Sequence, residues 1–196
     1  MRLGILGGSF NPIHSGHLLM AESARIACAL DKVLFIPANI PPHKDFTPEI
    51  SDGDRLKLIR LAIRGNPHFD LSDMELKRGG VSYTIDTVKA LYLQLNPKDR
   101  IYLILGGDLV EELATWKHYE DLKSLVDIVV VEREGEMGES YKEYDITHRV
   151  PGVGFNVSSS LIRERLAGGQ SIKYLVPEKV EDYILSRGLY GQAGVG

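Results

Sequence analysis

The chain has 196 residues, of which 43% are hydrophobic and 26% are charged, and it carries a formal net charge of −4 and a single cysteine. This composition is typical of a globular protein and fits a single domain over residues 1–196, while the negative charge argues against a broad basic surface for nucleic acid. We expect a cytoplasmic protein, because the sequence shows no signal peptide, no apolar run of about 18 residues that could span a membrane, and no second cysteine for an internal disulfide.

Residues 3–18 combine a short apolar run, a glycine pair and two histidines, and a helical pattern begins at the end of this stretch. The apolar run is typical of a buried parallel strand, and Gly7 and Gly8 permit a tight turn with bare N–H groups. His14 and His17 lie at the predicted helix start, whose dipole and free N–H groups favour phosphate. A zinc site is the alternative, disfavoured by the lack of nearby cysteine or carboxylate ligands.

A second strand is predicted over residues 32–37, followed by a proline-bearing loop, residues 38–44. Loops at the carboxyl ends of parallel strands line the ligand crevice of an open α/β sheet. Asn39, His43 and Lys44 are therefore placed where a second polar or anionic substrate could lie. A solvated loop without a ligand is the alternative.

A helix is predicted over residues 54–63, with Ser51 or Asp52 as its cap. Its inner face is expected to carry Leu56, Ile59, Leu61, Ala62 and Ile63.

A weak strand is predicted to start at Phe69 and to run toward Leu76. A helix over residues 82–95 should follow, with Ser82 or Thr84 as its cap. Capping alone would account for either hydroxyl.

Residues 100–105 form the clearest strand pattern in the chain, and Gly106, Gly107 and Asp108 follow it directly. As in residues 3–18, a glycine pair follows a predicted buried strand, and here the turn brings a carboxylate to the crevice. Asp108 could hold a hydroxyl group, help to position a metal ion, or simply cap a helix. A short helix over 109–114 should follow.

Trp116, the only tryptophan, comes just after this unit and could form an aromatic ligand wall or fill the core. Another buried strand is predicted over 127–131, with Arg133 just beyond it. Residues 134–149 are charged and non-periodic, which indicates a surface loop, and a last strand is predicted over 153–157.

Three serines, Ser158, Ser159 and Ser160, open a predicted helix that reaches about residue 167. Their hydroxyls and backbone amides make a second anion cradle, and Arg163 follows one turn later with a planar guanidinium that suits phosphate. A final helix over 177–185 completes a C-terminal helical part at about 158–190. The alternation of strands and helices predicts a Rossmann-like, doubly wound parallel sheet with helices on both faces.

These motifs resemble the HxGH nucleotidyltransferase superfamily, and among its members the bacterial nicotinate-nucleotide adenylyltransferases, over nearly the whole chain. Residues 7–17 match the superfamily signature, and residues 158–163 match its second phosphate-binding motif. The narrower likeness rests on residues 41–44, 82–87 and 115–116 and on the ending from 175 to 190.

The resemblance implies catalysis by His14, His17 and Arg163. It implies that ATP contacts Gly7, Gly8, Ser9, Phe10, His14, Gly16, His17, Gly106, Asp108, Ser158, Ser159, Ser160 and Arg163. Nicotinate mononucleotide is expected to contact Asn39, His43, Lys44, Thr84, Trp116, Tyr119 and Arg133. Many relatives carry an aromatic residue directly after the tryptophan, where this chain has Lys117, so either Lys117 or Tyr119 could face the pyridine ring.

The implied reaction is adenylyl transfer from ATP to nicotinate mononucleotide, with Mg²⁺ bridging phosphate oxygens and taking few or no protein ligands. Small molecules are the expected partners, and a homo-oligomer stays open. Two alternatives remain: a phosphopantetheine adenylyltransferase, which shares both phosphate motifs, and a non-catalytic nucleotide-binding module.

Overall fold

The computed structural model describes residues 1–42, 49–132, 144–154 and 156–191. Its centre is one six-stranded sheet in which every neighbouring pair is parallel. In spatial order the strands are β3 (Phe69–Leu71), β2 (Lys32–Pro37), β1 (Arg2–Gly8), β4 (Arg100–Gly106), β5 (Asp127–Glu132) and β6 (His148–Pro151). The predicted doubly wound parallel sheet is confirmed.

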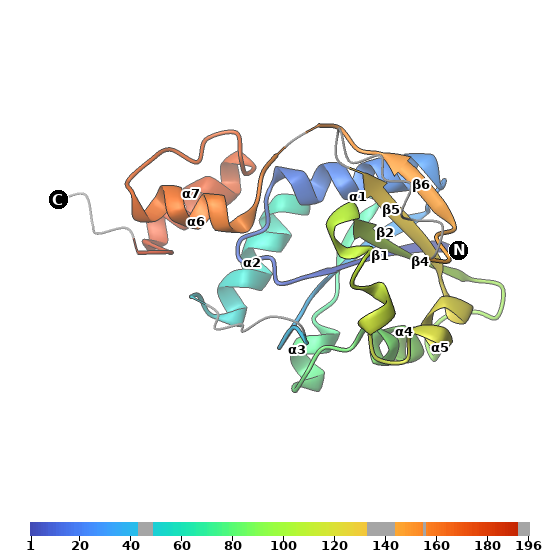
Figure 1. The fold of residues 1–196 in the computed structure, drawn as a ribbon. Coiled ribbons are helices and arrows are strands. Elements are labelled where there is room, and N and C mark those ends of the chain that lie inside the picture. Colours follow the sequence, from blue (N-terminus) through green and yellow to red (C-terminus); the bar gives the residue numbers. More distant parts are fainter. Residues whose placement is uncertain (43–48, 133–143, 155, 192–196) are drawn as a thin grey trace.

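Helices cover both faces of this sheet, as Figure 1 shows. The α-helices are α1 (Ser15–Ala27), α2 (Asp52–Ile63), α3 (Met74–Arg78), α4 (Thr84–Tyr92), α5 (Tyr119–Leu125), α6 (Ser159–Ala167) and α7 (Glu178–Arg187). Two 3₁₀ turns, η1 (Gly107–Leu109) and η2 (Leu113–Thr115), replace the predicted helix over 109–114.

The central strands divide the core into two layers because successive side chains point to opposite faces. In β4, Ile101, Leu103 and Leu105 pack with α4 and α5, whereas Tyr102 and Ile104 pack with α1, α2 and the C-terminal helices. Figure 1 shows α6 and α7 beside α2, at the end of the sheet where the chain leaves β1. This places the C-terminal helices next to the end of β1. The turn predicted at Gly7 and Gly8 is wrong, because both glycines are the last residues of β1 and pair with Ile36 and Pro37 of β2.

The core-facing side of helix α2 agrees in part with the prediction: Ile59 is buried, and Leu61, Ala62 and Ile63 pack against the core. Its buried residues are Arg55, Leu58 and Ile59, whereas Leu56 and residues 61–63 are half-buried. The predicted cap Ser51 is confirmed, because its hydroxyl accepts the N–H of Asp54.

Helix α4 is capped differently from the prediction. Its N-cap is Tyr83 and makes no side-chain cap bond, so neither Ser82 nor Thr84 caps it. The Ser82 hydroxyl instead accepts the N–H of Asn39 at 2.9 Å, which joins the end of β2 to the start of α4.

Two predicted strand segments are wrong. Residues 74–78 form α3 instead of extending the strand toward Leu76, and the last strand lies at 148–151 instead of 153–157. Strand β6 is short, charged and at the sheet edge, and Pro151 closes it because proline cannot donate a ladder bond. Gly152 and Gly154 interrupt the apolar pattern that follows. In the described part of the chain, no helix is long and apolar enough to cross a membrane.

Candidate active site

Two cavities meet at the carboxyl end of β1, which lies between β2 and β4 in the sheet. The polar cavity, of about 420 Å³, is lined by His14, His17, Glu49, Asp108, Ser158, Ser159, Ser160 and Arg163, among others. The apolar cavity, of about 170 Å³, is lined by Ile36, Pro41, Tyr83, Thr84, Leu109, Trp116 and Lys117, among others. Gly7, Gly8 and Ser9 line both. Ligand crevices of open α/β sheets occur at such a point, where the connections diverge.

His14 and His17 lie at the start of α1, as predicted. Their rings stack with centroids 3.7 Å apart, and the backbone N–H of His14 donates to Nδ1 of His17 at 3.2 Å. A neutral imidazole that accepts at Nδ1 carries its proton at Nε2. The hydrogen bond from the backbone therefore favours the His17 tautomer with its proton on Nε2, and both histidines line the polar cavity.

Phe10, which we expect to contact ATP, is fully buried and packs against the His17 ring. Its ring meets the His17 ring edge to face, with centroids 4.9 Å apart. Gly16 lets the His14 ring pack closely against the backbone, since a Cβ at position 16 would lie 3.0 Å from Nδ1 of His14. The two histidines are thus fixed by tight packing as well as by hydrogen bonding.

The hydroxyls of the three serines at the start of α6 are used within the protein. Ser158 caps the helix by accepting a backbone N–H, Ser159 donates to the Pro12 carbonyl at 2.9 Å, and Ser160 accepts from Arg163 at 3.3 Å. The groups that this helix start offers an anion are therefore mainly its backbone N–H groups and the positive end of its dipole.

Arg163 connects the C-terminal part to the loop before α1. Its Nη1 donates to the Asn11 carbonyl at 2.9 Å, and its Nε pairs with Glu49 at 2.8 Å. The Asn11 side chain in turn accepts the Tyr190 hydroxyl at 2.9 Å. Burial raises the pKa of Tyr190, so this hydroxyl stays protonated and donates at neutral pH. Sequence reasoning missed Glu49 and Tyr190.

Asp108 follows the second glycine turn and is exposed at the polar cavity. The N-cap of η1 is Gly106, so Asp108 is not the cap of this turn. A Cβ at Gly106 would lie 2.5 Å from Oδ1 of Asp108. Glycine is therefore needed for this carboxylate to fold back over the end of β4.

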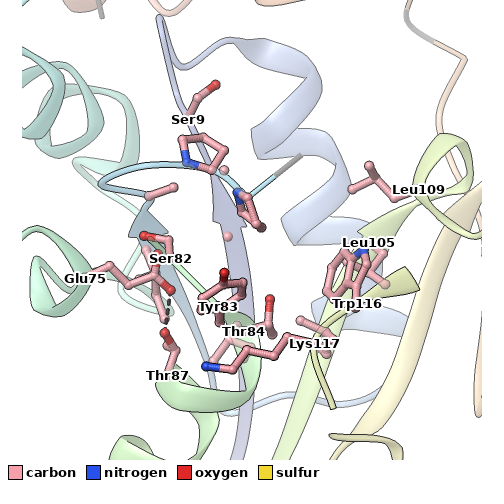
Figure 2. A pocket seen from close by; sticks show the side chains of 18 of the residues that line it. Ser9, Glu75, Ser82, Tyr83, Thr84, Thr87, Leu105, Leu109, Trp116 and Lys117 are labelled. Atoms are coloured by element: carbon pink, nitrogen blue, oxygen red, sulfur yellow. Dashed lines mark hydrogen bonds between the residues drawn. The ribbon is translucent and has the colours of Figure 1, made fainter. Parts of the chain in front are cut away.

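The apolar cavity lies between the end of β4 and the start of α4. Figure 2 shows Trp116 and Leu109 on one side and Ser82 and Tyr83 on the other. Thr84, the first residue of α4, brings its helix start to the same cavity. Two apolar walls and one helix terminus suit a flat ring that carries an anionic or acceptor group.

A buried carboxylate, which the sequence analysis did not anticipate, also lines the apolar cavity. Glu75 is 7% exposed and accepts the Thr87 hydroxyl at 2.5 Å. Arg78 donates to the same hydroxyl at 2.9 Å and lies 3.9 Å from the carboxylate. The charge of Glu75 is therefore engaged by residues of α3 and α4.

Other expected site residues lie apart from the cavities or outside the described part of the chain. Asn39 acts as a brace, since its side chain donates to the Gly80 carbonyl at 2.9 Å and its N–H donates to Ser82. Tyr119 lines a separate surface recess, while Lys117 lines the apolar cavity. Three expected residues lie outside the described residues: His43, Lys44 and Arg133.

Arg55 lies beneath the junction of the two cavities, and the sequence analysis missed it. This fully buried side chain donates to the Ser9 carbonyl at 2.9 Å and to the Ala38 carbonyl at 2.8 Å, and it pairs with Asp52. It therefore joins the chain segments that leave β1 and β2, at the place where both substrates of a two-substrate enzyme would meet.

Comparisons with known proteins identify the family of this chain. The model of the cytidylyltransferase-like family matches residues 5–165. A protein of Citrifermentans bemidjiense is 42% identical over 98% of this chain and all of its own, and one of Geobacillus kaustophilus is 44% identical over 97% of this chain and 86% of its own; both are named probable nicotinate-nucleotide adenylyltransferase.

Among solved structures, a Plasmodium falciparum nicotinic acid mononucleotide adenylyltransferase complexed with NaAD has a TM-score of 0.80 at 22% identity, and the match covers 96% of this chain and 97% of that one. This likeness shows the shared fold. Together with the full-length sequence matches it confirms the resemblance: the chain belongs to the nicotinate-nucleotide adenylyltransferases of the cytidylyltransferase-like family.

Proposed function

We propose that this chain transfers the adenylyl group of ATP to nicotinate mononucleotide, giving deamido-NAD and pyrophosphate, a step of NAD biosynthesis. The observation that carries the proposal is the meeting of two chemically different cavities at residues 7–9, at the end of β1. The polar cavity suits a triphosphate, and the apolar cavity suits a pyridine ring. A ligand pair that fills both would bring its phosphates together at the end of β1.

In this reaction the phosphate of the mononucleotide attacks the α-phosphorus of ATP in line, and pyrophosphate leaves. The nucleophile is already an anion, so no general base is needed. The protein must hold two anions against their mutual repulsion and neutralise the charge that builds in the transition state.

The polar cavity supplies donors for these tasks. His14 and His17 contact the phosphates around the reacting centre in this proposal, because both stand at the start of α1 and line the polar cavity. Arg163 and the backbone N–H groups of Ser159 and Ser160 hold the leaving pyrophosphate. Catalysis is then mainly electrostatic stabilisation by groups that are already oriented.

The apolar cavity receives the nicotinate ring, with Trp116 as a flat wall and the α4 start at Thr84 facing the ring carboxylate. His43, Lys44 and Arg133 stay in the proposal as contacts to the mononucleotide. Asn39 supports this side through its bonds to residues 80 and 82. Tyr119 stays only as an outer contact, since it lines the separate recess.

Mg²⁺ accompanies ATP in this proposal and neutralises part of the phosphate charge. In the part of the chain that the structure describes, no group of three or more His, Cys, Asp or Glu side chains is arranged to hold a metal. Asp108 is an exposed carboxylate at the polar cavity, so it suits contact with a metal-bound water. If Mg²⁺ were bound with ATP, phosphate oxygens and water would be its preferred ligands. A cytoplasmic location is part of the same proposal.

The test is pyrophosphate release from ATP with nicotinate mononucleotide, nicotinamide mononucleotide, phosphopantetheine or no acceptor. The ring carboxylate of the acid only accepts hydrogen bonds, so it can pair with the donors of the cavity. The NH₂ group of the amide is itself a donor, so it leaves a donor of the cavity without an acceptor, and a buried unpaired donor costs ~1–3 kcal/mol. We expect kcat/KM for the acid to exceed that for the amide at least about tenfold. Preference for the amide, or turnover only with phosphopantetheine, would refute the proposal.

A further inference from the structure

We propose that the Lys117 side chain sets the preference of the apolar cavity for an acidic acceptor. This inference rests on the proposed function. Lys117 directly follows Trp116, and both line the apolar cavity. Among the described residues that line this cavity, Lys117 is the one cation.

The position of the Lys117 ammonium is defined by two partners at the start of α4. Its Nζ lies 4.2 Å from the centroid of the Tyr83 ring and 3.3 Å from Oδ2 of Asp86. Figure 2 shows the side chain extending from the side of Trp116 toward α4, below Tyr83 and Thr84. The charge is therefore held at the end of the cavity where α4 begins.

This placement adds a positive charge to a helix terminus that already favours an anion. The α4 start at Thr84 directs backbone N–H groups and the positive end of its dipole into the cavity. A carboxylate on a ring beside Trp116 would meet both the helix start and the ammonium. An amide at the same position would feel almost none of this attraction, because it carries no net charge.

Asp86 limits the effect without removing it. The Lys117 and Asp86 side chains are 40% and 41% exposed, and ion pairs this exposed are weak. A bound carboxylate can therefore take over part of the ammonium's interaction with Asp86, while the Tyr83 ring keeps the ammonium in place. Removal of the Lys117 charge should lower the preference for the acid, whereas removal of the Asp86 charge should raise it.

The experiment measures kcat/KM for nicotinate and nicotinamide mononucleotides in four variants. Lys117→Gln should lower the ratio of acid to amide about five- to tenfold, mainly through the acid, since the field of a nearby charge acts on the ionised group. Lys117→Arg should keep the ratio near that of the wild type. Asp86→Asn should raise it about two- to fivefold. Lys89→Gln, on an exposed position of α4, is the matched control and should leave it unchanged.

If Lys117 had only a structural role, Lys117→Gln would lower kcat/KM for both mononucleotides by the same factor. An unchanged ratio of acid to amide in Lys117→Gln would overturn the inference. Failure of the proposed function looks different: the wild-type protein would release no pyrophosphate with either mononucleotide. Calorimetric binding of the two mononucleotides to the wild type and to Lys117→Gln would then still decide the question. Equal affinity losses for both would overturn the inference, and a loss confined to the acid would support it.

Discussion

The polar and apolar cavities share residues 7–9 at the end of β1 but are built in different ways. The polar cavity is assembled from side chains and helix starts far apart in the sequence, from Asn11 to Arg163, and hydrogen bonds hold them together. The apolar cavity is shaped by packing around Trp116 and Tyr83, with a helix start at one end. In the proposed function, the polar cavity supplies the phosphate chemistry, and the apolar cavity selects the acceptor. Changes in the first should affect every acceptor alike.

The strongest test of this division is His17→Ala. Loss of one preoriented donor to the transition state should lower kcat/KM by roughly 10²–10³, and by the same factor for the acid and the amide. Pyrophosphate release measures the loss, and circular dichroism checks that the variant is folded. Near-normal turnover in a folded variant would remove His17 from the mechanism, and a factor that depends on the acceptor would break the division between the cavities.

Arg55→Met should disturb both cavities at once. It removes the Arg55 donor from the buried Ala38 carbonyl and the half-buried Ser9 carbonyl, and an unpaired buried group costs ~1–3 kcal/mol. We expect the free energy of unfolding to fall by about 2–4 kcal/mol in urea titrations. Arg60→Met, an exposed change on the same helix, should cost less than about 0.5 kcal/mol. Equal losses in the two variants would mean that the Arg55 contacts contribute little.

The sequence predicts the sheet and the two helix starts of the polar cavity because these features are local and repeat a strand–loop–helix order. It misplaces the first turn, because Gly7 and Gly8 continue β1. It does not predict Arg55, although position 55 lies three and four residues before the buried Leu58 and Ile59 and therefore on the same helix face. When its hydrogen-bond acceptors are unknown, an arginine on an apolar helix face is interpreted as a side chain that extends into solvent. Those acceptors are backbone carbonyls of distant residues, which no local pattern encodes.

The same reasoning explains the misplaced last strand. Residues 153–157 alternate apolar and other residues, but pairing with β5 occurs at His148–Pro151. An edge strand of four residues has too few side chains to produce a clear period. The hydrogen bond between Tyr190 and Asn11 is not predicted either, because 179 positions separate the two residues in the sequence.

Arg163→Lys tests which cavity binds ATP. Lysine keeps the charge but loses the planar fork that reaches the Asn11 carbonyl and a ligand together. Loss of one charge-assisted hydrogen bond should weaken ATP binding and turnover by about tenfold. Binding of nicotinate mononucleotide without ATP, measured by calorimetry, should barely change. The reverse pattern would exchange the two substrates between the cavities.

Glu49→Gln should have the smallest effect, and it should be a gain. Glu49 pairs with Arg163 in a cavity proposed to bind an anion, so its charge competes with the triphosphate. Half-exposed ion pairs contribute at most about 1 kcal/mol, so KM for ATP should fall by about two- to fivefold. Glu164→Gln, exposed on α6, is the control. A higher KM in Glu49→Gln would show that Glu49 helps to orient Arg163 for the ligand.

The bond between Tyr190 and Asn11 has a consequence for the newly made protein. A ribosome makes Asn11 long before Tyr190, so the loop ahead of the two histidines emerges without its brace. The contacts from Ser159 and Arg163 to the same loop also come late. The growing chain can therefore pair its first strands early, but it acquires a fully supported phosphate site only after the C-terminal helices have been synthesised and have docked. Activity then marks a chain that has been translated and folded through residue 190.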